Sequence, residues 1–174
     1  MRLLVKRRTM AAVCLCLLLS CCSYRLRGTG SSLPPHIKKL YVPMFTNQTT
    51  RFQLDLKLTE SVRDELVARG KVELTPIQAD ADAVLVGDIV NYTVNPISFT
   101  QEATADRYKI IIVAKIVLRD LVNRSIIFSN PSFTYMEEYE VTPGTVFESV
   151  EQVAIEKVSI KFARTVVINI LEGF

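Results

Sequence analysis

The sequence has few of the residues from which metal centres and disulfides are built. It contains one histidine, His36, and four cysteines, and all four cysteines lie within the first 22 residues. The chain from residue 23 onward therefore has no internal disulfide and no thiolate metal site. A histidine-based metal cluster is excluded as well, because a single imidazole cannot form one.

The sequence also lacks the short motifs that carry common enzyme chemistry. It has no Gly-x-Ser-x-Gly nucleophile elbow, no P-loop and no Gly-x-Gly-x-x-Gly fingerprint. His36 stands beside Pro35 at a loop-to-strand junction, where we expect a solvated histidine and not a general base. Asp80 and Asp82 belong to a turn that leads into a strand, and we interpret them as ordinary loop acids. We therefore expect no catalytic residue, no metal, no cofactor and no enzyme activity.

The chain has no excess of positive charge once the first 20 residues are set aside. The chain has 21 Lys and Arg against 18 Asp and Glu, but four of the cations and none of the acids lie within residues 1–20. The other 17 cations meet 18 acids, so the rest of the chain is close to neutral. Nucleic-acid binding, which needs a concentrated basic face, gains no support from this composition.

The first 20 residues have the organisation of a secretory signal. Residues 2–8 carry three arginines and one lysine without an acid, and residues 9–20 are uncharged. The uncharged stretch suits the apolar core of a signal peptide, and it is shorter than the roughly 20 residues that a membrane-spanning helix needs. We therefore expect a precursor that is secreted and cleaved.

The segment Leu18-Leu19-Ser20-Cys21 resembles the lipobox at which bacterial lipoproteins are acylated and cut. A thiolate is the nucleophile that the thioether link requires, and the small Ser20 suits cleavage before Cys21. The overlapping segment Leu19-Ser20-Cys21-Cys22 is a second match, so Cys21 is the expected lipidation site and Cys22 is the alternative. An ordinary cleaved signal and an uncleaved N-terminal anchor are the competing interpretations.

Acylation at one of these cysteines would keep the protein on its membrane. Each buried CH₂ group contributes roughly 0.8 kcal/mol, so the two or three acyl chains of a lipoprotein cysteine anchor stably. The chain would then be anchored and would not span the bilayer. We expect a signal peptide over residues 1–20, a lipidated N-terminus and tether over residues 21–35, and one domain over residues 36–174.

Two stretches have the periodicity of amphipathic helices. Leucine or valine recurs at every fourth residue from Leu54 to Leu66, and Gly70 is placed to end a helix predicted over residues 52–69. A second helix is predicted over residues 146–171. Its apolar stripe consists of Val150, Ala154, Val158, Phe162, Val166 and Ile170.

Strands are predicted between these helices from runs of β-branched residues and from turn signals. The run 107–121 returns through a turn at residues 122–124 and forms a long antiparallel hairpin. The elements together predict an α+β fold, a two-layer α/β sandwich with both helices on one face of a mixed, mostly antiparallel sheet of about four strands. The predicted strands are 37–44, 83–94, 107–121 and 125–141, with a short edge strand beginning within 71–75.

The strand predicted over residues 107–121 has two chemically different faces. Its even positions from Tyr108 to Leu118 are apolar, whereas its odd positions carry four cations. The cationic face should lie away from the helices, together with the hairpin aromatics Phe133, Tyr135 and Tyr139. A solvated strand face and a surface that contacts an anionic ligand or a partner fit this pattern equally well. The four cations are Arg107, Lys109, Lys115 and Arg119.

Several segments also line up, in order, with those of one known family. They are Cys22 to Gly28 (the start of that family's mature chain), Leu33 to Thr49 (its first strand and turn), Ala81 to Ile89 with Arg107-Tyr108-Lys109 (its middle strands), and Asn130-Pro131 with Glu137-Glu138-Tyr139 (its last strand). No single motif is diagnostic, but the ordered set is. On this set the chain resembles the LPS-assembly lipoprotein family LptE.

The resemblance implies a non-catalytic outer-membrane lipoprotein that faces the periplasm. Such a protein would lie as a plug inside its partner, the large β-barrel LptD, and would assist barrel assembly and the transport of lipopolysaccharide to the outer leaflet. Two departures concern the anchor: the family alignment prefers Cys22 to Cys21, and Ser23 replaces the usual glycine. Neither cysteine is followed by Asp, which signals inner-membrane retention in enteric bacteria.

Other classes of protein remain compatible with the residues alone. A membrane-anchored lipoprotein that activates a peptidoglycan synthase would also be a small α/β domain. A periplasmic enzyme and a generic lipid-binding lipoprotein are further alternatives, although no residue nominates a catalytic mechanism. Co-purification with a barrel or with a synthase would separate the first two classes.

Overall fold

The computed structural model describes residues 33–101, 105–141 and 147–173, with all their side chains except those of residues 147–150. The predicted anchor residues Cys21 and Cys22 lie outside this part. The described part contains helices α2 (Leu54–Arg69) and α3 (Phe147–Glu172) and a short 3₁₀ turn, η1 (Gln78–Asp80). Its strands are β1 (Lys39–Tyr41), β2 (Thr46–Asn47), β3 (Glu73–Leu74), β4 (Ala83–Phe99), β5 (Ala105–Asp120) and β6 (Ser125–Glu140).

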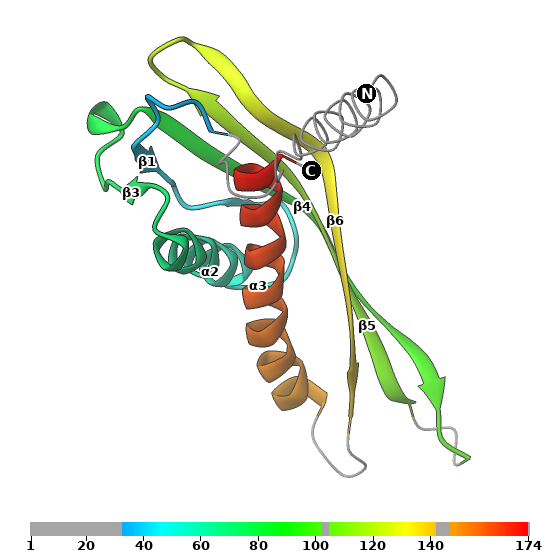
Figure 1. Ribbon diagram of the computed structural model, residues 1–174. Coiled ribbons are helices and arrows are strands. Elements are labelled where there is room, and N and C mark those ends of the chain that lie inside the picture. Colours follow the sequence, from blue (N-terminus) through cyan, green and yellow to red (C-terminus); the bar gives the residue numbers. More distant parts are fainter. Residues whose placement is uncertain (1–32, 102–104, 142–146, 174) are drawn as a thin grey trace, which may run out of the picture. The chain divides into compact units, whose positions relative to one another are not determined.

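The strands form one mixed sheet in the order β3-β1-β4-β5-β6, and β2 pairs with β4 off this path. The short strands β1, β2 and β3 pair in parallel, whereas β4, β5 and β6 form two long antiparallel ladders. Both helices cover the same face of this sheet (Figure 1). The predicted arrangement is therefore confirmed in outline, but the number of about four strands is wrong. The described residues form six, because the short edge strand predicted within residues 71–75 is present as β3 and because β2, with two residues, is too short to show an alternation in sequence.

The first strand is shorter than predicted. Only Lys39–Tyr41 of the predicted run 37–44 pairs with neighbouring strands. Pro43 has no N–H group to donate, so the ladder breaks there. The chain then returns to the sheet as β2, which pairs further along β4.

The central strand is longer than predicted, because it continues past Val94 to Phe99. β1 and β2 cover one edge of β4 only as far as Ile89. Among the described residues, β4 pairs from Asn91 onward with β5 alone. Proline is tolerated on a strand edge that donates no ladder hydrogen bond, which explains how Pro96 lies within β4.

The predicted periodicity of both helices is confirmed. The α2 residues Leu54, Leu58, Val62 and Leu66 have no exposed surface. Gly70 ends α2 in the left-handed conformation (φ 60°), and its N–H donates to the carbonyl oxygen of Val67. On α3 the stripe from Ala154 to Ile170 is likewise buried.

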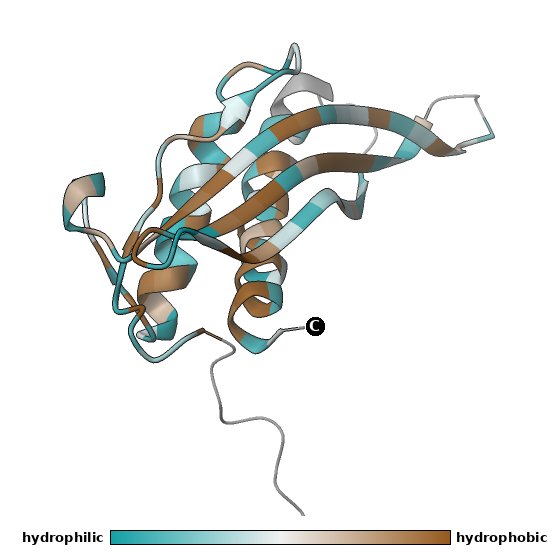
Figure 2. Cartoon of the chain, turned by 90° about the horizontal axis from the view of Figure 1, so that it is seen from above, coloured by the Kyte–Doolittle hydropathy of each residue, from teal (hydrophilic) through white to brown (hydrophobic). Residues whose placement is uncertain are grey.

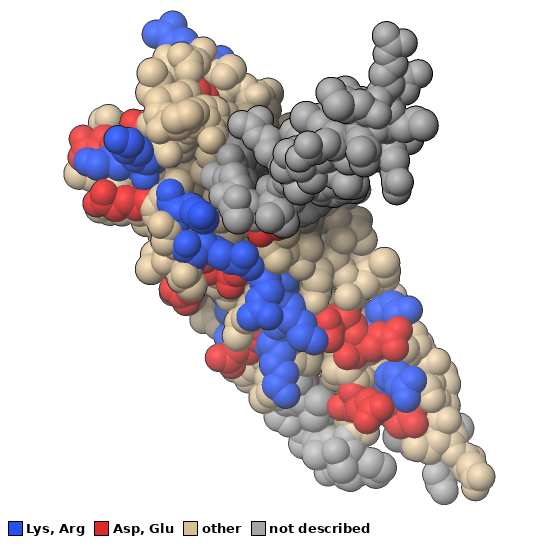
Figure 3. Space-filling view, viewed as in Figure 1, with Lys and Arg blue, Asp and Glu red and all other residues tan. Residues whose placement is uncertain are grey.

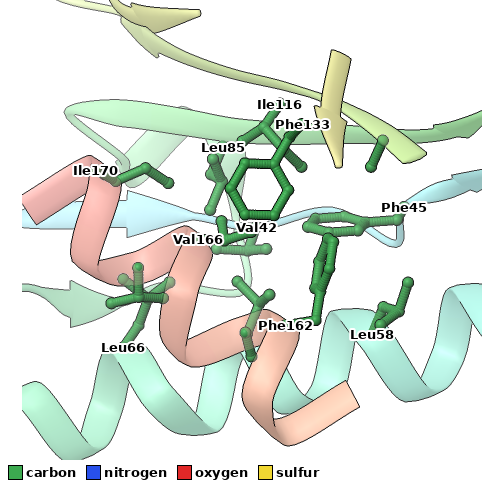
Figure 4. Close-up of a cluster of buried hydrophobic side chains, with 14 of the residues drawn as sticks. Val42, Phe45, Leu58, Leu66, Leu85, Ile116, Phe133, Phe162, Val166 and Ile170 are labelled. Carbon is green, nitrogen blue, oxygen red and sulfur yellow. The ribbon is translucent and has the colours of Figure 1, made fainter. Parts of the chain in front are cut away.

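The core lies between the two helices and the sheet. Figure 4 shows Leu58 and Leu66 of α2 and Val166 of α3 pointing toward Leu85 and Ile116 of the sheet. Coloured by hydropathy, the strands and helices around this interior carry long apolar stretches (Figure 2). Burial of this one layer of side chains is the main favourable term that holds the helices on the sheet.

The hairpin aromatics lie on the helix side of the sheet, which corrects the prediction for Phe133, Tyr135 and Tyr139. The rings of Phe133 and Tyr135 contact Phe162 of α3 edge-on, with centroids 5.4 and 6.2 Å apart. Tyr139 stacks on Tyr108, which belongs to the apolar face of β5. The β5–β6 register shifts between Ala114 and Ile116 and again at Leu118–Arg119. Beyond both shifts, Phe133, Tyr135 and Tyr139 stand across the ladder from Ala114, Ile112 and Tyr108 of the apolar face, so the pairing register decides their side.

Candidate functional site

The four predicted cations lie on one strand and on the same side of the sheet, away from the helices. They occupy odd positions of β5, whose even positions Ile110, Ile112, Ile116 and Leu118 are fully buried in the core. Their partners across the ladders are residues of β4 and β6 outside the hydrophobic core. We call this row of Arg107, Lys109, Lys115 and Arg119 the β5 cation row.

Two members of the row are already paired with acids of β6. Arg107 Nη2 lies 3.3 Å from Glu140 Oε1, and Lys109 Nζ lies 3.1 Å from Glu138 Oε1. These pairs are direct neighbours across the antiparallel ladder. In Figure 3 blue and red side chains alternate over this end of β5 and β6. The local charge is therefore close to balanced, and an anionic ligand would have to displace a glutamate.

The other two members form no such ion pair with a described residue. Lys115 and Arg119 are exposed, and within the described residues neither one forms an ion pair. Lys115 stands across the ladder from Asp88 of β4, and Arg119 stands across from Val84 and Ile126. The structure therefore divides the predicted row into a balanced half and a half whose cations remain available.

A second polar cluster, which the sequence reading missed, surrounds the end of β5. His36 Nε2 lies 2.7 Å from Asp120 Oδ2, and the Asn123 amide reaches both side chains. Backbone N–H groups of Val122 and Asn123 donate to Asp120 Oδ1. The prediction of a solvated His36 therefore needs correction. Its ring is held against the carboxylate of Asp120, whose side chain is 2% exposed.

Two acids in this region are held in their charged form. The backbone N–H of Asn123, with further hydrogen bonds from His36 and the Asn123 side chain, lowers the pKa of Asp120 to about 2. Backbone N–H groups of Lys39 and Lys38 lower the pKa of Asp82, which we had interpreted as an ordinary loop acid. Asp82 therefore ties the start of β1 to the start of β4.

A third polar group links three elements beside the core. Glu151 of α3 is 6% exposed and accepts a hydrogen bond from the Tyr92 hydroxyl at 2.7 Å. Its other oxygen lies 3.1 Å from Arg51 Nη1. Burial, then the hydrogen bond to Glu151, raises the pKa of Tyr92 well above its usual range. We interpret this group as a structural link and not as a binding site, because each of its charges has a partner.

The described residues hold no group of three or more His, Cys, Asp or Glu side chains close enough to bind a metal ion. Neither described helix combines the length and the apolar composition that a bilayer-spanning segment requires. The geometry thus presents a layered domain with a cationic sheet face.

A family model for lipopolysaccharide assembly, LptE, matches residues 37–170. This match covers nearly all of the described domain. The chain belongs to the LptE family. A search of the curated proteins found no match to the sequence.

Solved structures resemble the chain at low sequence identity. A hypothetical protein of Chlamydia trachomatis superimposes with a TM-score of 0.53 at 10% identity, covering 79% of this chain and 97% of its own. The rare lipoprotein B of Shewanella oneidensis superimposes with a TM-score of 0.49 at 14% identity, covering 75% of this chain and 91% of its own. The first likeness supports the fold, and the family match identifies a lipopolysaccharide-assembly protein.

Proposed function

We propose that this LptE-family chain is an outer-membrane lipoprotein, anchored through Cys21 or alternatively Cys22, that lies as a plug inside an LptD-type β-barrel. It would assist assembly of the barrel and the passage of lipopolysaccharide to the outer leaflet, without catalysing a reaction. The observation that carries this proposal is the family match over residues 37–170. The lipobox supports the anchor, because it stands where the uncharged stretch of the signal ends.

The physical demands on a plug support the same proposal. A body that fills a barrel must keep its shape, and here two helices and a sheet share a single close-packed core. The lumen of an outer-membrane barrel is polar, so the matching surface should be polar as well. The sheet face that carries the β5 cation row meets this demand with ion pairs and exposed cations.

The exposed half of the β5 cation row supplies a specific role. Lipopolysaccharide is a phosphorylated glycolipid, and phosphate oxygens are bound best by charge-assisted hydrogen bonds. Arg119 can bind a phosphate with two parallel hydrogen bonds, whereas Lys115 contributes a compact point charge. We propose that the whole row contacts lipopolysaccharide phosphates or acidic lumen residues, with Lys115 and Arg119 making the principal contacts. Arg107 and Lys109 would contribute less, because Glu140 and Glu138 already neutralise them.

The deciding experiment is purification of the full-length lipidated chain, tagged at its C-terminus, from solubilised outer membranes of its native host. Recovery of a large β-barrel protein, identified by mass spectrometry, is the expected result. Wild-type membranes without the tag serve as the control for adventitious barrels. Recovery of a peptidoglycan synthase in place of a barrel, or of neither protein, would contradict the proposal.

A further inference from the structure

The segment that contains β2 and leads into α2 exposes two large apolar side chains. Phe52 is 83% exposed, the highest value among the large hydrophobic residues that the structure describes, and Met44 is 48% exposed. Both line one open surface hollow of about 490 Å³. The remaining lining residues are Asn47, Thr49, Thr50, Arg51, Gln53, Asp55 and Leu56. We call residues 44–56 the Phe52 turn.

Hydrogen bonds fix the shape of this turn. Asn47 Oδ1 accepts from the N–H and the hydroxyl of Thr49, at 3.0 and 2.7 Å, and Asn47 Nδ2 donates to the Arg51 carbonyl oxygen at 2.8 Å. The Thr49 hydroxyl in turn accepts from the Arg51 N–H. The Arg51 guanidinium is paired with the buried Glu151 of α3. Phe52 therefore projects from a support that is bonded internally and to the helix layer.

Phe52 does not serve the helix that it precedes. With Gln53 at the N-cap, Phe52 occupies the position whose hydrophobic side chain often packs against the fourth helical residue. That residue is Lys57, and Phe52 remains exposed, so no such staple forms. Gln53 itself has a left-handed backbone (φ 60°) and makes no side-chain cap. At position 52 a polar side chain would favour folding, yet Phe52 exposes its ring. At position 53 a capping residue would favour folding, yet Gln53 adopts an unfavourable backbone and makes no cap.

The surface around Phe52 carries little available charge. Arg51 is paired with Glu151, and Asp55 is half-buried in the first turn of α2. The exposed residues of residues 44–53 are Met44, Thr46, Gln48, Thr50, Phe52 and Gln53, all uncharged. An anionic lipid surface is bound through cations, which this rim does not offer. Centres of protein interfaces, by contrast, are enriched in aromatic residues and Met and depleted of charge.

We propose that the Phe52 turn is a protein-docking site at which Phe52 inserts into an apolar recess of the partner, with Met44 packed beside it. The partner is the β-barrel of the proposed function, and the inference rests on that function. An exposed aromatic side chain on a hydrogen-bonded turn, next to a hollow, is the arrangement of an interface hot spot, since the backbone of the turn loses little conformational freedom on binding. The turn would thus fix the position of the plug, separately from the β5 cation row.

The test uses the full-length lipidated chain and the purified LptD-type barrel of the same organism in detergent. The dissociation constant is measured for wild type, Phe52→Ser, Met44→Ser and Phe52→Leu, with Val67→Ser as the matched control. Val67 is 62% exposed near the other end of α2, so its substitution removes a similar exposed apolar group. All variants should keep the wild-type melting temperature, because none of these side chains is buried.

Phe52→Ser is expected to weaken barrel binding by about tenfold or more. Met44→Ser and Phe52→Leu should have smaller effects, and Val67→Ser should have none. Equal binding by wild type and Phe52→Ser would overturn this inference and leave the proposed function standing. If wild type itself does not bind the barrel, the proposed function and the inference fall together. In a background with both Cys21 and Cys22 replaced by serine, weaker binding of Phe52→Ser than of its Phe52 parent to barrel-free phosphatidylethanolamine–phosphatidylglycerol vesicles would assign the turn to a lipid surface, and the inference would be wrong.

Discussion

The ring of Phe45 occupies the space into which a side chain at position 87 would grow. A Cβ atom added to Gly87 would lie 2.7 Å from two carbons of the Phe45 ring. Phe45 is 2% exposed, so the ring has no open space into which it can turn. The contact packs the segment between β1 and β2 against β4 at Gly87. Phe45 is also the second residue of the Phe52 turn, so the same contact holds the start of that turn on the sheet.

Gly87→Ala is expected to destabilise the domain by about 1–3 kcal/mol, because a close-packed core absorbs an added methyl group only through strain. Urea unfolding followed by circular dichroism gives the change in free energy. Phe45→Leu in the Gly87→Ala background should recover part of the loss, since the two positions are in contact. Additive effects of the two substitutions would show that the contact is not the cause.

The Asp120 cluster predicts a defined acid dependence of stability. The pKa of Asp120 is lowered from 3.8 to about 2 in the folded protein, so its charged form stabilises the fold above the ordinary carboxyl pKa. This contribution is lost as pH falls from about 4 through about 2. Asp120→Asn should therefore be destabilised relative to wild type at pH 7, and the difference should shrink over that acid range. A difference that stays constant from pH 7 to pH 2 would contradict the assignment.

The two halves of the β5 cation row should differ in their effect on lipopolysaccharide binding. Lys115→Ser with Arg119→Ser should weaken binding severalfold, and the loss should diminish at high salt, where surface charges are screened. Arg107→Ser with Lys109→Ser should have a smaller effect, because those cations are paired with Glu140 and Glu138. Binding of purified lipopolysaccharide at two salt concentrations measures both. Unchanged binding after substitution of all four cations would remove the row from the site.

The anchor is decided by the first residue of the mature chain. Acyl chains are expected on Cys21, so Cys22→Ser should leave acylation and membrane association unchanged, whereas replacement of both cysteines by serine should abolish acylation and release the protein from the membrane fraction. The physical reason is that only the residue directly after the cut carries the acyl chains that hold the domain on the bilayer. Mass spectrometry of the native N-terminus measures the modification directly. Acyl chains on Cys22 of the native chain would select Cys22, and an unmodified thiol at both positions would exclude a lipoprotein.

Local periodicity was enough to predict both helices and the apolar face of β5. Each depends on residues two, three or four positions apart, and the helix or strand geometry alone brings these onto one face. Leu54 to Leu66 and Ile110 to Leu118 were therefore identified as core without knowledge of the topology. The ordered segments from Leu33 to Tyr139 likewise pointed to the LptE family, which the family match confirms.

The candidate site was predicted only in part. The sequence placed the four cations on one strand face, but it could not show that Glu138 and Glu140 lie opposite two of them. The Phe52 turn was missed, because an isolated Phe in a polar stretch has no periodicity to reveal it. One local signal could have revealed the turn. Phe52 stands where a hydrophobic staple of α2 would begin, but the residue against which it would pack is Lys57, which is not apolar.

The sequence by itself determined the helices, the inner face of β5 and the family, since these follow from near neighbours or from their order along the chain. Only the tertiary structure decided that Phe133 and Tyr135 face α3, because β6 pairs with β5 in a register that sets them opposite Ala114 and Ile112 of the apolar face. It also decided that His36 meets Asp120 across 84 positions of sequence. Such relationships depend on which strands pair and in what register, and burial of the whole core selects that pairing.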